Sequence, residues 1–600
     1  MSNEKTGGGY GMKKRKIGFW IVFALLLAAM LAVLELNKNT VAGFCLCLAA
    51  ALLFAFLHGR AKKKGLRALC WVGFLALFVL ILFLSWPPVR AVPATEGKES
   101  ARSPVVLTRK GKVQGVLSAD GAVEVYTGIP YAKPPVGELR WREPQEPDAW
   151  EGTLLCDHFA PMSMQPTNLP IYDSLAQIVG YHDYTISLTD NSIEPVSEDA
   201  LYVNVWKPSG EVADLPVYVF IHGGSLQTGQ PWYADYSGLG LAREGVIVVN
   251  MGYRLGVFGY LADEELMAES PNGTTGNYGL LDQIKALEWV RDNIAAFGGD
   301  PDNVTLAGES AGAAAVSALC TSPLAKGLFE HVVLESSTVA SIEPPHSFRT
   351  LDEALKSGKD LKERYGVTSI DELRALPAEK LAGEASTQHH MTVDGYALTE
   401  TPCEAYRRGV HNEKAILHGY NSEESGPFVL LSQAGMKDFE SRVRRYFGDE
   451  TDAVLAIYPA ATDDEARAYW AEIYGAVFFD YPHYCLNRLA VENGIPVWEY
   501  CFSRSNGRLG AWHSGEMVYC YGNIPADSAL YDARDRELSA QMLSYWANFA
   551  SYGDPNGAGL PAWEQNESSS RLMGFGDETK MLDEREHALF AVLDRMQGWE

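Results

Sequence analysis

The sequence predicts an α/β fold with a mostly parallel central sheet, preceded by three transmembrane helices. Apolar strand-like segments alternate with helical ones after about residue 105, as in parallel sheets whose strands are joined by helices. One strand-like segment runs through a glycine-rich turn, Gly308 to Gly312, directly into a helical segment. Three long apolar runs within residues 17–86 predict the membrane helices.

Charge is divided unevenly along the 600 residues. Residues 1–90 hold 12 Lys or Arg and 2 Asp or Glu, a net charge of +10. Because the whole chain has a net charge of −26, residues 91–600 carry −36. A basic head on an acidic body argues against nucleic acid as a partner. Two interpretations of the acidic body stay open, a solvated surface and an attraction for cationic substrates.

The three apolar runs predict spans at 17–36, 41–57 and 68–86, because 17 to 20 apolar residues can cross a bilayer. A cleaved signal peptide is the alternative for the first run, since basic residues precede it. Two further runs follow at once and no small-residue cleavage site stands out, which favours a membrane helix.

Loop charges predict the orientation of these spans. The loop 58–67 holds five Lys or Arg, the loop 37–40 holds one, and Lys13–Lys16 precede the first span. Because Lys and Arg concentrate in cytoplasmic loops, residues 1–16 are expected in the cytoplasm. The proline-containing linker 87–104 and the domain 105–600 are then expected outside, anchored to the lipid bilayer of the cell membrane through residues 17–86.

The body carries strand and helix signals in α/β order. A helix is expected at 278–297, where apolar residues recur at helical spacing and Gly298-Gly299 follow. Segments 351–381 and 436–475 are expected to be helical and are candidates for capping the site. The expected strands are 123–126, 202–206, 217–221, 245–249, 303–307, 331–334, 415–418 and 496–501.

The turn Gly308-Glu309-Ser310-Ala311-Gly312 is a G-x-S-x-G pattern between a strand and a helix. A serine at the tip of such a turn sits in strained backbone, and residues two positions away must lack side chains to avoid clashes. The exposed hydroxyl then lies at a helix N-terminus, where N–H groups favour a developing oxyanion. Ser310 is therefore the candidate nucleophile.

The nine cysteines show no C-x-x-C pair and no clustering with histidine, so no metal site is expected. Cys45, Cys47 and Cys70 lie in the apolar runs, and the other six are scattered through the body. One or two disulfides remain open.

Taken together, several segments resemble the type-B carboxylesterases, the α/β-hydrolase family that includes cholinesterases and bacterial esterases. The resemblance covers about residues 104–597 and leaves the membrane runs outside. It implies an α/β-hydrolase fold and hydrolysis of a small-molecule carboxylic ester without a cofactor. The matching stretches, in family order, are 128–141, 197–206, 222–225, 277–282, 297–303, the turn at Ser310, 419–424, 510–516, 545–550 and 553–556.

The resemblance also implies a catalytic triad of Ser310, Glu424 and His513. Their chain order is the one expected of α/β-hydrolases. A serine needs an adjacent base, which the family motif places at His513. The acid that orients the imidazole falls on Glu424, with the adjacent Glu423 as the competing candidate, because Ser425 stands where the family usually has glycine.

The family pattern assigns the oxyanion-hole N–H groups to Gly224, Ser225 and Ala311. Ser225 stands where the family often has a third glycine. Because only the backbone N–H is needed there, the serine should be tolerated. Ser163 and Ala200 stand where the animal enzymes tend to have disulfide cysteines, so that bridge is expected to be absent and Cys156 to be unpaired.

Two functions follow from this sequence. The first is a membrane-anchored serine hydrolase acting on carboxylic esters outside the cytoplasm. The second is a non-catalytic binding or adhesion domain on the same fold, which the presence of Ser310, Glu424 and His513 disfavours. The sequence carries no signal for the oligomeric state.

Overall fold

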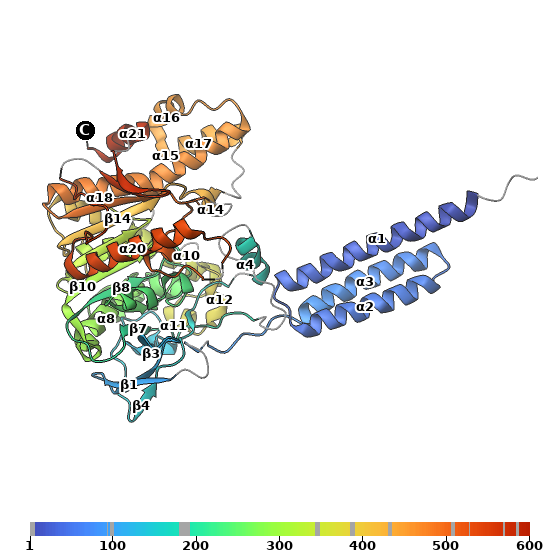
Figure 1. The fold of residues 1–600 in the computed structure, drawn as a ribbon, viewed down its shortest axis with the longest axis horizontal. Helices are drawn as coiled ribbons and strands as arrows, with labels where there is room; N and C mark the ends of the chain where they lie inside the picture. Colours follow the sequence, from blue (N-terminus) through green and yellow to red (C-terminus); the bar gives the residue numbers. More distant parts are fainter. Residues whose placement is uncertain are drawn as a thin grey trace, which may run out of the picture. The chain divides into compact units, whose positions relative to one another are not determined.

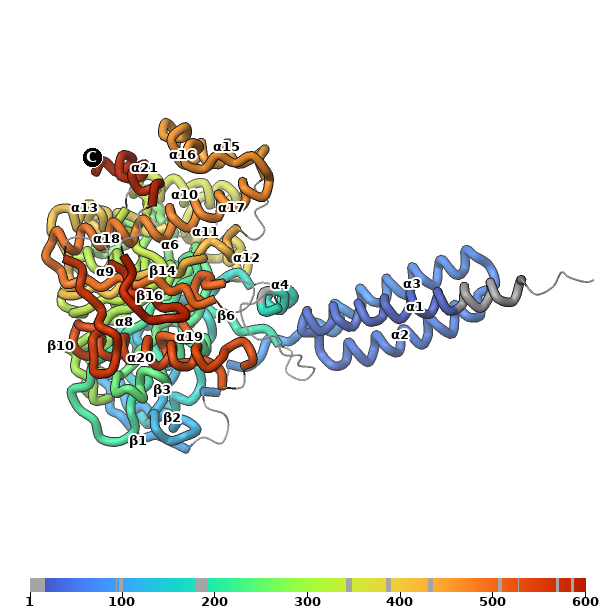
Figure 2. The backbone as a smooth tube through the Cα atoms, turned by 45° about the horizontal axis from the view of Figure 1, so that its top comes forward, coloured from blue at the N-terminus to red at the C-terminus, as the bar shows by residue number. Residues whose placement is uncertain are grey.

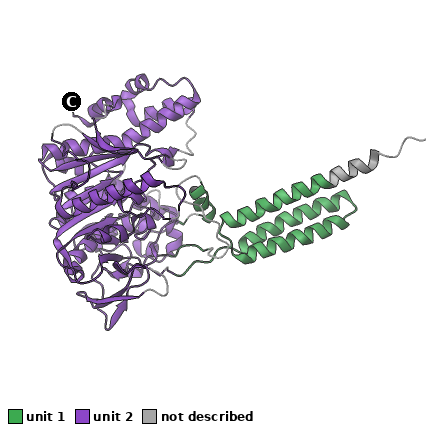
Figure 3. Cartoon of the chain, in the orientation of Figure 1, with its two compact units in different colours: residues 1–91, 167–195 green, residues 92–166, 196–600 purple. Residues whose placement is uncertain are grey.

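The computed structural model describes residues 7–92, 94–95, 101–167, 169–178, 192–341, 348–384, 390–429, 435–505, 510–526, 528–567, 571–583 and 587–599. The chain divides into two compact units, coloured separately in Figure 3. One unit contains residues 1–91 and 167–195, and the other contains residues 92–166 and 196–600.

The first unit is built on three long helices, α1 (Gly7–Leu36), α2 (Val41–Arg60) and α3 (Lys64–Leu84), with a short α4 (Pro170–Ala176) packed against α1. The three long helices contain candidate spans of mean hydropathy 2.8, 2.3 and 2.5. Many of their large apolar side chains face outward, such as Leu52, which is 75% exposed. A surface of this kind is suited to an apolar solvent rather than to water.

A polar cluster ties the α1–α2 loop to the end of α3. Asn39 Nδ2 donates to Ser85 Oγ at 2.9 Å and to the Leu82 carbonyl at 2.8 Å. Ser85 Oγ in turn donates to the Ile81 carbonyl, and the Thr40 N–H donates to the Ser85 carbonyl. The buried side chains of Asn39 and Ser85 therefore have hydrogen-bond partners at this end of the bundle.

The second unit is organised on one 13-stranded sheet, in the order β1-β2-β3-β7-β9-β8-β10-β11-β14-β15-β16-β17, with β4 paired to β2. The strands are β1 (Arg102–Leu107), β2 (Lys112–Leu117), β3 (Val123–Pro130), β4 (Thr153–Leu155), β7 (Tyr202–Pro208), β8 (Leu215–Ile221), β9 (Ile247–Met251), β10 (Gly299–Glu309), β11 (His331–Glu335), β14 (Ala415–Asn421), β15 (Val497–Phe502), β16 (Leu572–Phe575) and β17 (Thr579–Leu582). Two small parallel pairs lie apart, β5 (Met162–Ser163) with β6 (Val196–Ser197) and β12 (Phe348–Thr350) with β13 (Met391–Val393).

Neighbours from β9 through β16 in this order are parallel. The remaining neighbours along the order are antiparallel, and β4 pairs with β2 in parallel. The predicted α/β fold with a mostly parallel sheet is therefore confirmed. Strand β1 begins at Arg102, inside the segment expected as linker, because Val106 and Val113 bury their side chains across the β1–β2 pair.

Apolar residues cover both faces of the sheet. Along β8, Val217, Val219 and Ile221 belong to one core cluster, whereas Tyr218 and Phe220 belong to another on the opposite face. Helices α8 and α9 pack on the first face, and α5, α19 and α20 on the second, with α20 in contact with β8 and β10 (Figure 1). This two-sided burial is what a parallel sheet requires.

The helices of this unit are α5 (Leu239–Arg243), α6 (Gly256–Tyr260), α7 (Glu264–Glu269), α8 (Tyr278–Asn293), α9 (Ala311–Thr321), α10 (Leu351–Tyr365), α11 (Ile370–Arg374), α12 (Ala378–Ala382), α13 (Pro402–Arg407), α14 (Gly426–Val429), α15 (Met436–Phe447), α16 (Thr451–Ile457), α17 (Asp463–Gly475), α18 (Tyr481–Glu492), α19 (Met517–Cys520), α20 (Ala533–Tyr552) and α21 (Ala588–Gln597). Segments 351–381 and 436–475 each form three helices rather than one, and α15, α16, α17 and α21 gather together (Figure 2). A capping box at Thr350 and a left-handed Gly366 set the ends of α10.

Candidate active site

The turn between β10 and α9 has the geometry expected of a nucleophile elbow. Ser310 has φ 55° and ψ −126°, a strained conformation for a residue with a side chain. A Cβ added at Gly308 would lie 2.5 Å from the Gly312 carbonyl carbon, and one at Gly312 would lie 2.0 Å from the Ile221 carbonyl oxygen. Both glycines are therefore needed for the turn to pack against α9 and β8.

The loop that follows β8 lies beside this turn. A Cβ added at Gly223 would come within 2.9 Å of the Ser310 Cβ. Gly224 has φ 105° and Ser225 has φ 57°, so the loop turns sharply at the predicted oxyanion residues. Gln165 holds its far end, donating from Nε2 to the Gly229 carbonyl at 2.8 Å and accepting from the Gly229 N–H at 2.9 Å.

Three backbone N–H groups at this place are open to a ligand. Within the described segments, the N–H groups of Gly224 and Ser225 have no acceptor. Ala311 is the first residue of α9, where an N–H has no intrahelical partner and the helix dipole favours negative charge. Donors of this kind can stabilise the oxyanion of an acyl-transfer intermediate.

The structure brings two of the predicted residues into a direct hydrogen bond. His513 Nδ1 lies 2.6 Å from Glu424 Oε2, and Glu424 Oε1 accepts from the Asn421 N–H at 2.8 Å. Glu424 is 2% exposed, whereas Glu423 is exposed at the surface and lies beside Gly510. Glu424, and not Glu423, is thus the carboxylate in contact with the imidazole.

Burial raises the pKa of the Glu424 carboxyl, and the Asn421 N–H and the Ser336 hydroxyl oppose that rise. The bond from His513 Nδ1 acts in the same direction as these two donors, because it favours the charged carboxylate. An acid in this position can hold the imidazole in one tautomer and stabilise its protonated form.

The other ring nitrogen faces a residue that the sequence analysis did not single out. His513 Nε2 lies 3.3 Å from Glu309 Oε1, which also accepts a hydrogen bond from the Ser514 hydroxyl. Burial raises the pKa of Glu309 to about 7, and the neighbouring His513 opposes this. The Ser310 hydroxyl has no partner among the described residues. Hydrogen bonds between nucleophile and base are often long before substrate binds.

A second pair of buried acids lies beneath these residues. Glu516 accepts from Ser336 Oγ at 2.9 Å and from Asn421 Nδ2, so it shares Asn421 with Glu424. Glu335 accepts from Trp546 Nε1 at 2.8 Å. Burial raises the pKa of Glu516 to about 7 and that of Glu335 further. The only sequence signal for these acids was that Glu309 and Glu516 fall inside the matched motifs.

Two aromatic rings flank the imidazole. The ring centroids of Phe428 and Phe479 each lie 5.0 Å from that of His513. They come from α14 and from the turn of π-helix before α18, so segments distant in sequence limit the access of water to the base.

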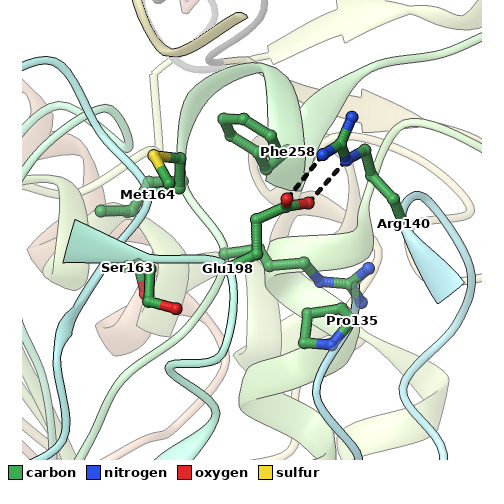
Figure 4. A pocket seen from close by; sticks show the side chains of 9 residues that line it. Pro135, Arg140, Ser163, Met164, Glu198 and Phe258 are labelled. Carbon is green, nitrogen blue, oxygen red and sulfur yellow. Dashed lines mark hydrogen bonds and ion pairs between the residues drawn. The ribbon is translucent and has the colours of Figure 1, made fainter. Parts of the chain in front are cut away.

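A cavity of about 10 Å³ near β5 and β6 is separate from these residues (Figure 4). It has room for about one water molecule. Arg140 closes one side through two 2.6 Å bonds to Glu198. In the described parts of the chain, no group of three or more His, Cys, Asp or Glu is arranged to hold a metal ion. None of the nine cysteines, all of which are described, forms a disulfide, and this includes the buried Cys156.

Comparisons with known proteins agree with this geometry. The model of the carboxylesterase family matches residues 102–590. Fumonisin B1 esterase of Sphingopyxis macrogoltabida is 34% identical over 496 residues, covering 78% of this chain and 86% of that protein. Para-nitrobenzyl esterase of Bacillus subtilis (strain 168) is 30% identical, covering 75% and 90%.

Solved structures give the same result. A PNB esterase structure superposes with a TM-score of 0.69 at 29% identity, covering 82% of this chain and 99% of that one. A carboxylesterase of Geobacillus stearothermophilus superposes with a TM-score of 0.69 at 30% identity, covering 81% and 99%. The sheet is thus that of an α/β-hydrolase, and the chain belongs to the carboxylesterase family and is a carboxylic ester hydrolase.

Proposed function

We propose that this protein is a membrane-anchored serine hydrolase that cleaves carboxylic esters through an acyl-enzyme on Ser310. The observation that carries the proposal is the 2.6 Å bond between His513 and the buried Glu424, at the same edge of the sheet as the strained Ser310 turn. The family assignment supports ester hydrolysis, and the roles of the individual residues are the part proposed here.

In the proposed reaction, His513 takes the proton of Ser310 as the hydroxyl attacks the ester carbonyl. The N–H groups of Gly224, Ser225 and Ala311 stabilise the resulting oxyanion. His513 then gives its proton to the leaving alcohol, and the acyl group remains on Ser310. Water activated by His513 releases the carboxylic acid, while Glu424 stabilises the charged imidazole throughout.

The test is Ser310→Ala. The change removes one oxygen and should leave the fold intact, while kcat/KM for a chromogenic ester falls by about three to six orders of magnitude. A fluorophosphonate should add to Ser310 of the unaltered chain and not to the variant, as read by peptide mass. Labelling of another serine, or full activity of the variant, would refute the assignment. A non-catalytic binding domain would take no label at all.

We also propose that the chain spans a cell membrane three times, with residues 1–16 inside and residues 87–600 outside. The helices α1 to α3 support a membrane anchor. The orientation rests on the five Lys or Arg in 58–67 against the single one in 37–40. Protease added to intact cells should reach the hydrolase domain and spare an epitope placed before Lys13. Protection of the domain until lysis would reverse the orientation.

A further inference from the structure

A groove runs along the first unit between α2 and α3, which lie side by side (Figure 1). It encloses about 390 Å³, and none of its lining side chains is charged. Gly73 opens it, since a Cβ added there would meet no atom within 4 Å. The lining residues are Ala50, Leu53, Phe54, Leu57, Leu66, Leu69, Cys70, Gly73, Phe74 and Leu77.

The length of the groove matches one leaflet of a bilayer. Its lining on α3 extends from Leu66 to Leu77, which is roughly 16 Å of helix. The hydrocarbon core of a bilayer is about 30 Å thick, so one leaflet is about half of that. An apolar groove of this length can hold an acyl chain.

One end of the groove reaches the α2–α3 loop, which is strongly basic. The basic residues are Arg60, Lys62, Lys63, Lys64 and Arg67, and all of them are exposed. Arg67 directly follows the groove residue Leu66, and Arg60 lies one helical turn beyond Leu57.

These cations lie in a stretch of the chain that contains no acidic residue. Across the described residues, none of the five has an ion-pair partner, and the sequence contains no Asp or Glu between Lys38 and Thr95. Arg67 donates from Nε to the Ala61 carbonyl, and Arg60 stacks on the Phe56 ring at 3.9 Å. The Arg67 guanidinium is thereby held at the loop, and that of Arg60 lies over a ring one turn back along α2.

We propose that this groove and its basic loop bind one anionic phospholipid. The acyl chain lies between α2 and α3, and the phosphate of the headgroup meets the five cations. Clusters of Lys and Arg at the end of a membrane helix attract anionic headgroups in this way. A second copy of the chain is a poorer occupant, because a symmetric pair would place two such loops together and they would repel.

The experiment uses the full chain in a neutral detergent, with phosphatidylglycerol and phosphatidylcholine of identical acyl chains as probes. Native mass spectrometry should show one phosphatidylglycerol bound, with an apparent dissociation constant at least about tenfold lower than for phosphatidylcholine. The triple variant Lys62→Gln, Lys63→Gln, Lys64→Gln should weaken this preference at least about threefold, because it removes three of the five cations that meet the headgroup and leaves the groove unchanged.

A second variant tests the groove itself. Gly73→Leu should fill it and weaken phosphatidylglycerol binding, whereas Gly18→Leu should not. Gly18 is the matched control, because a Cβ there is equally free of contacts but lies on α1, outside the groove. Turnover of a water-soluble ester should be the same in every variant, so this result is independent of the proposed catalytic residues.

Equal binding of the two lipids by the unaltered chain, or full preference in the triple variant, would overturn the proposal. So would a dimer that Gly73→Leu dissociates, since the groove would then belong to a second copy. Equal effects of Gly73→Leu and Gly18→Leu would show that the binding site lies elsewhere on the helices.

Discussion

The two units of this protein use apolar residues in opposite ways. In the hydrolase unit, Val217, Val219 and their neighbours on the central strands are fully buried between sheet and helices. In the first unit, Leu52 and Leu84 stand more than two thirds exposed on helices that contain almost no charge. The first pattern is the one expected where apolar side chains are withdrawn from water. The second is the one expected of helices whose apolar side chains face lipid.

Polar groups show the reverse contrast. Among its buried glutamates, the hydrolase unit places Glu309 and Glu424 against the His513 ring, with Glu335 and Glu516 close by. In the described part of the first unit, the buried polar residues are Glu35, Asn37, Asn39 and Ser85 at one end of the bundle and Ser174 on α4. Buried polar groups cost free energy unless they are hydrogen-bonded, so the bonds among Asn37, Asn39 and Ser85 stabilise that end of the bundle.

The largest expected effect concerns the carboxylate at the imidazole in the hydrolase unit. Glu424→Gln should lower kcat/KM by about three to four orders of magnitude, because an amide favours the wrong tautomer and cannot stabilise the charged ring. Glu423→Gln is the matched control, one residue away and exposed, and should change kcat/KM by less than about twofold. Steady-state kinetics on one chromogenic ester decides it. The opposite ranking would mean that Glu423 orients His513 in solution.

An intermediate effect on stability should come from a buried histidine pair in the hydrolase unit. His418 Nδ1 lies 2.9 Å from His483 Nδ1, both residues have no exposed surface, and burial lowers the pKa of His418 to about 3. The unfolded chain takes up this proton near pH 6.5 and the folded chain only near 3. Stability is therefore unaffected above pH 6.5 and is lost as the pH falls towards 3.

When the pH falls from 7.5 to 5, the parent should lose about 2 kcal/mol more unfolding free energy than the His418→Val variant. The buried glutamates contribute with the opposite sign, because their pKa values are raised, but they do so equally in variant and parent. Denaturant unfolding at the two pH values measures the difference. Parallel losses in both proteins would show that the pair is not responsible.

The smallest effect on catalysis should come from separating the two units. A chain beginning at Val92 should be soluble without detergent and should hydrolyse a short, water-soluble ester within about threefold of the full chain, because the sheet and site lie in residues 92–166 and 196–600. Sedimentation and steady-state kinetics check both claims. A soluble but inactive product would mean that the helices support the site and do not only anchor it.

The sequence alone determined the elements whose causes are local. The three long apolar runs, the helix after Tyr278 and the strand before Ser310 follow from hydrophobic spacing, and the fold class follows from their alternation. Gly308 also has a local reason, since a Cβ there would lie 2.5 Å from the Gly312 carbonyl carbon, whereas the clash at Gly312 is with Ile221 of β8 and is tertiary. Motif resemblance added the expected positions of the acid and the base.

Only the tertiary structure decided what meets at the imidazole. Glu423 and Glu424 are adjacent in sequence, and only the direction in which the chain leaves β14 buries one and exposes the other. Glu309 reaches His513 Nε2 across 204 positions of the chain because β10, β11 and β14 are neighbours in one sheet that ends at a common edge. The groove between α2 and α3 likewise depends on how two helices pack, which hydropathy does not encode.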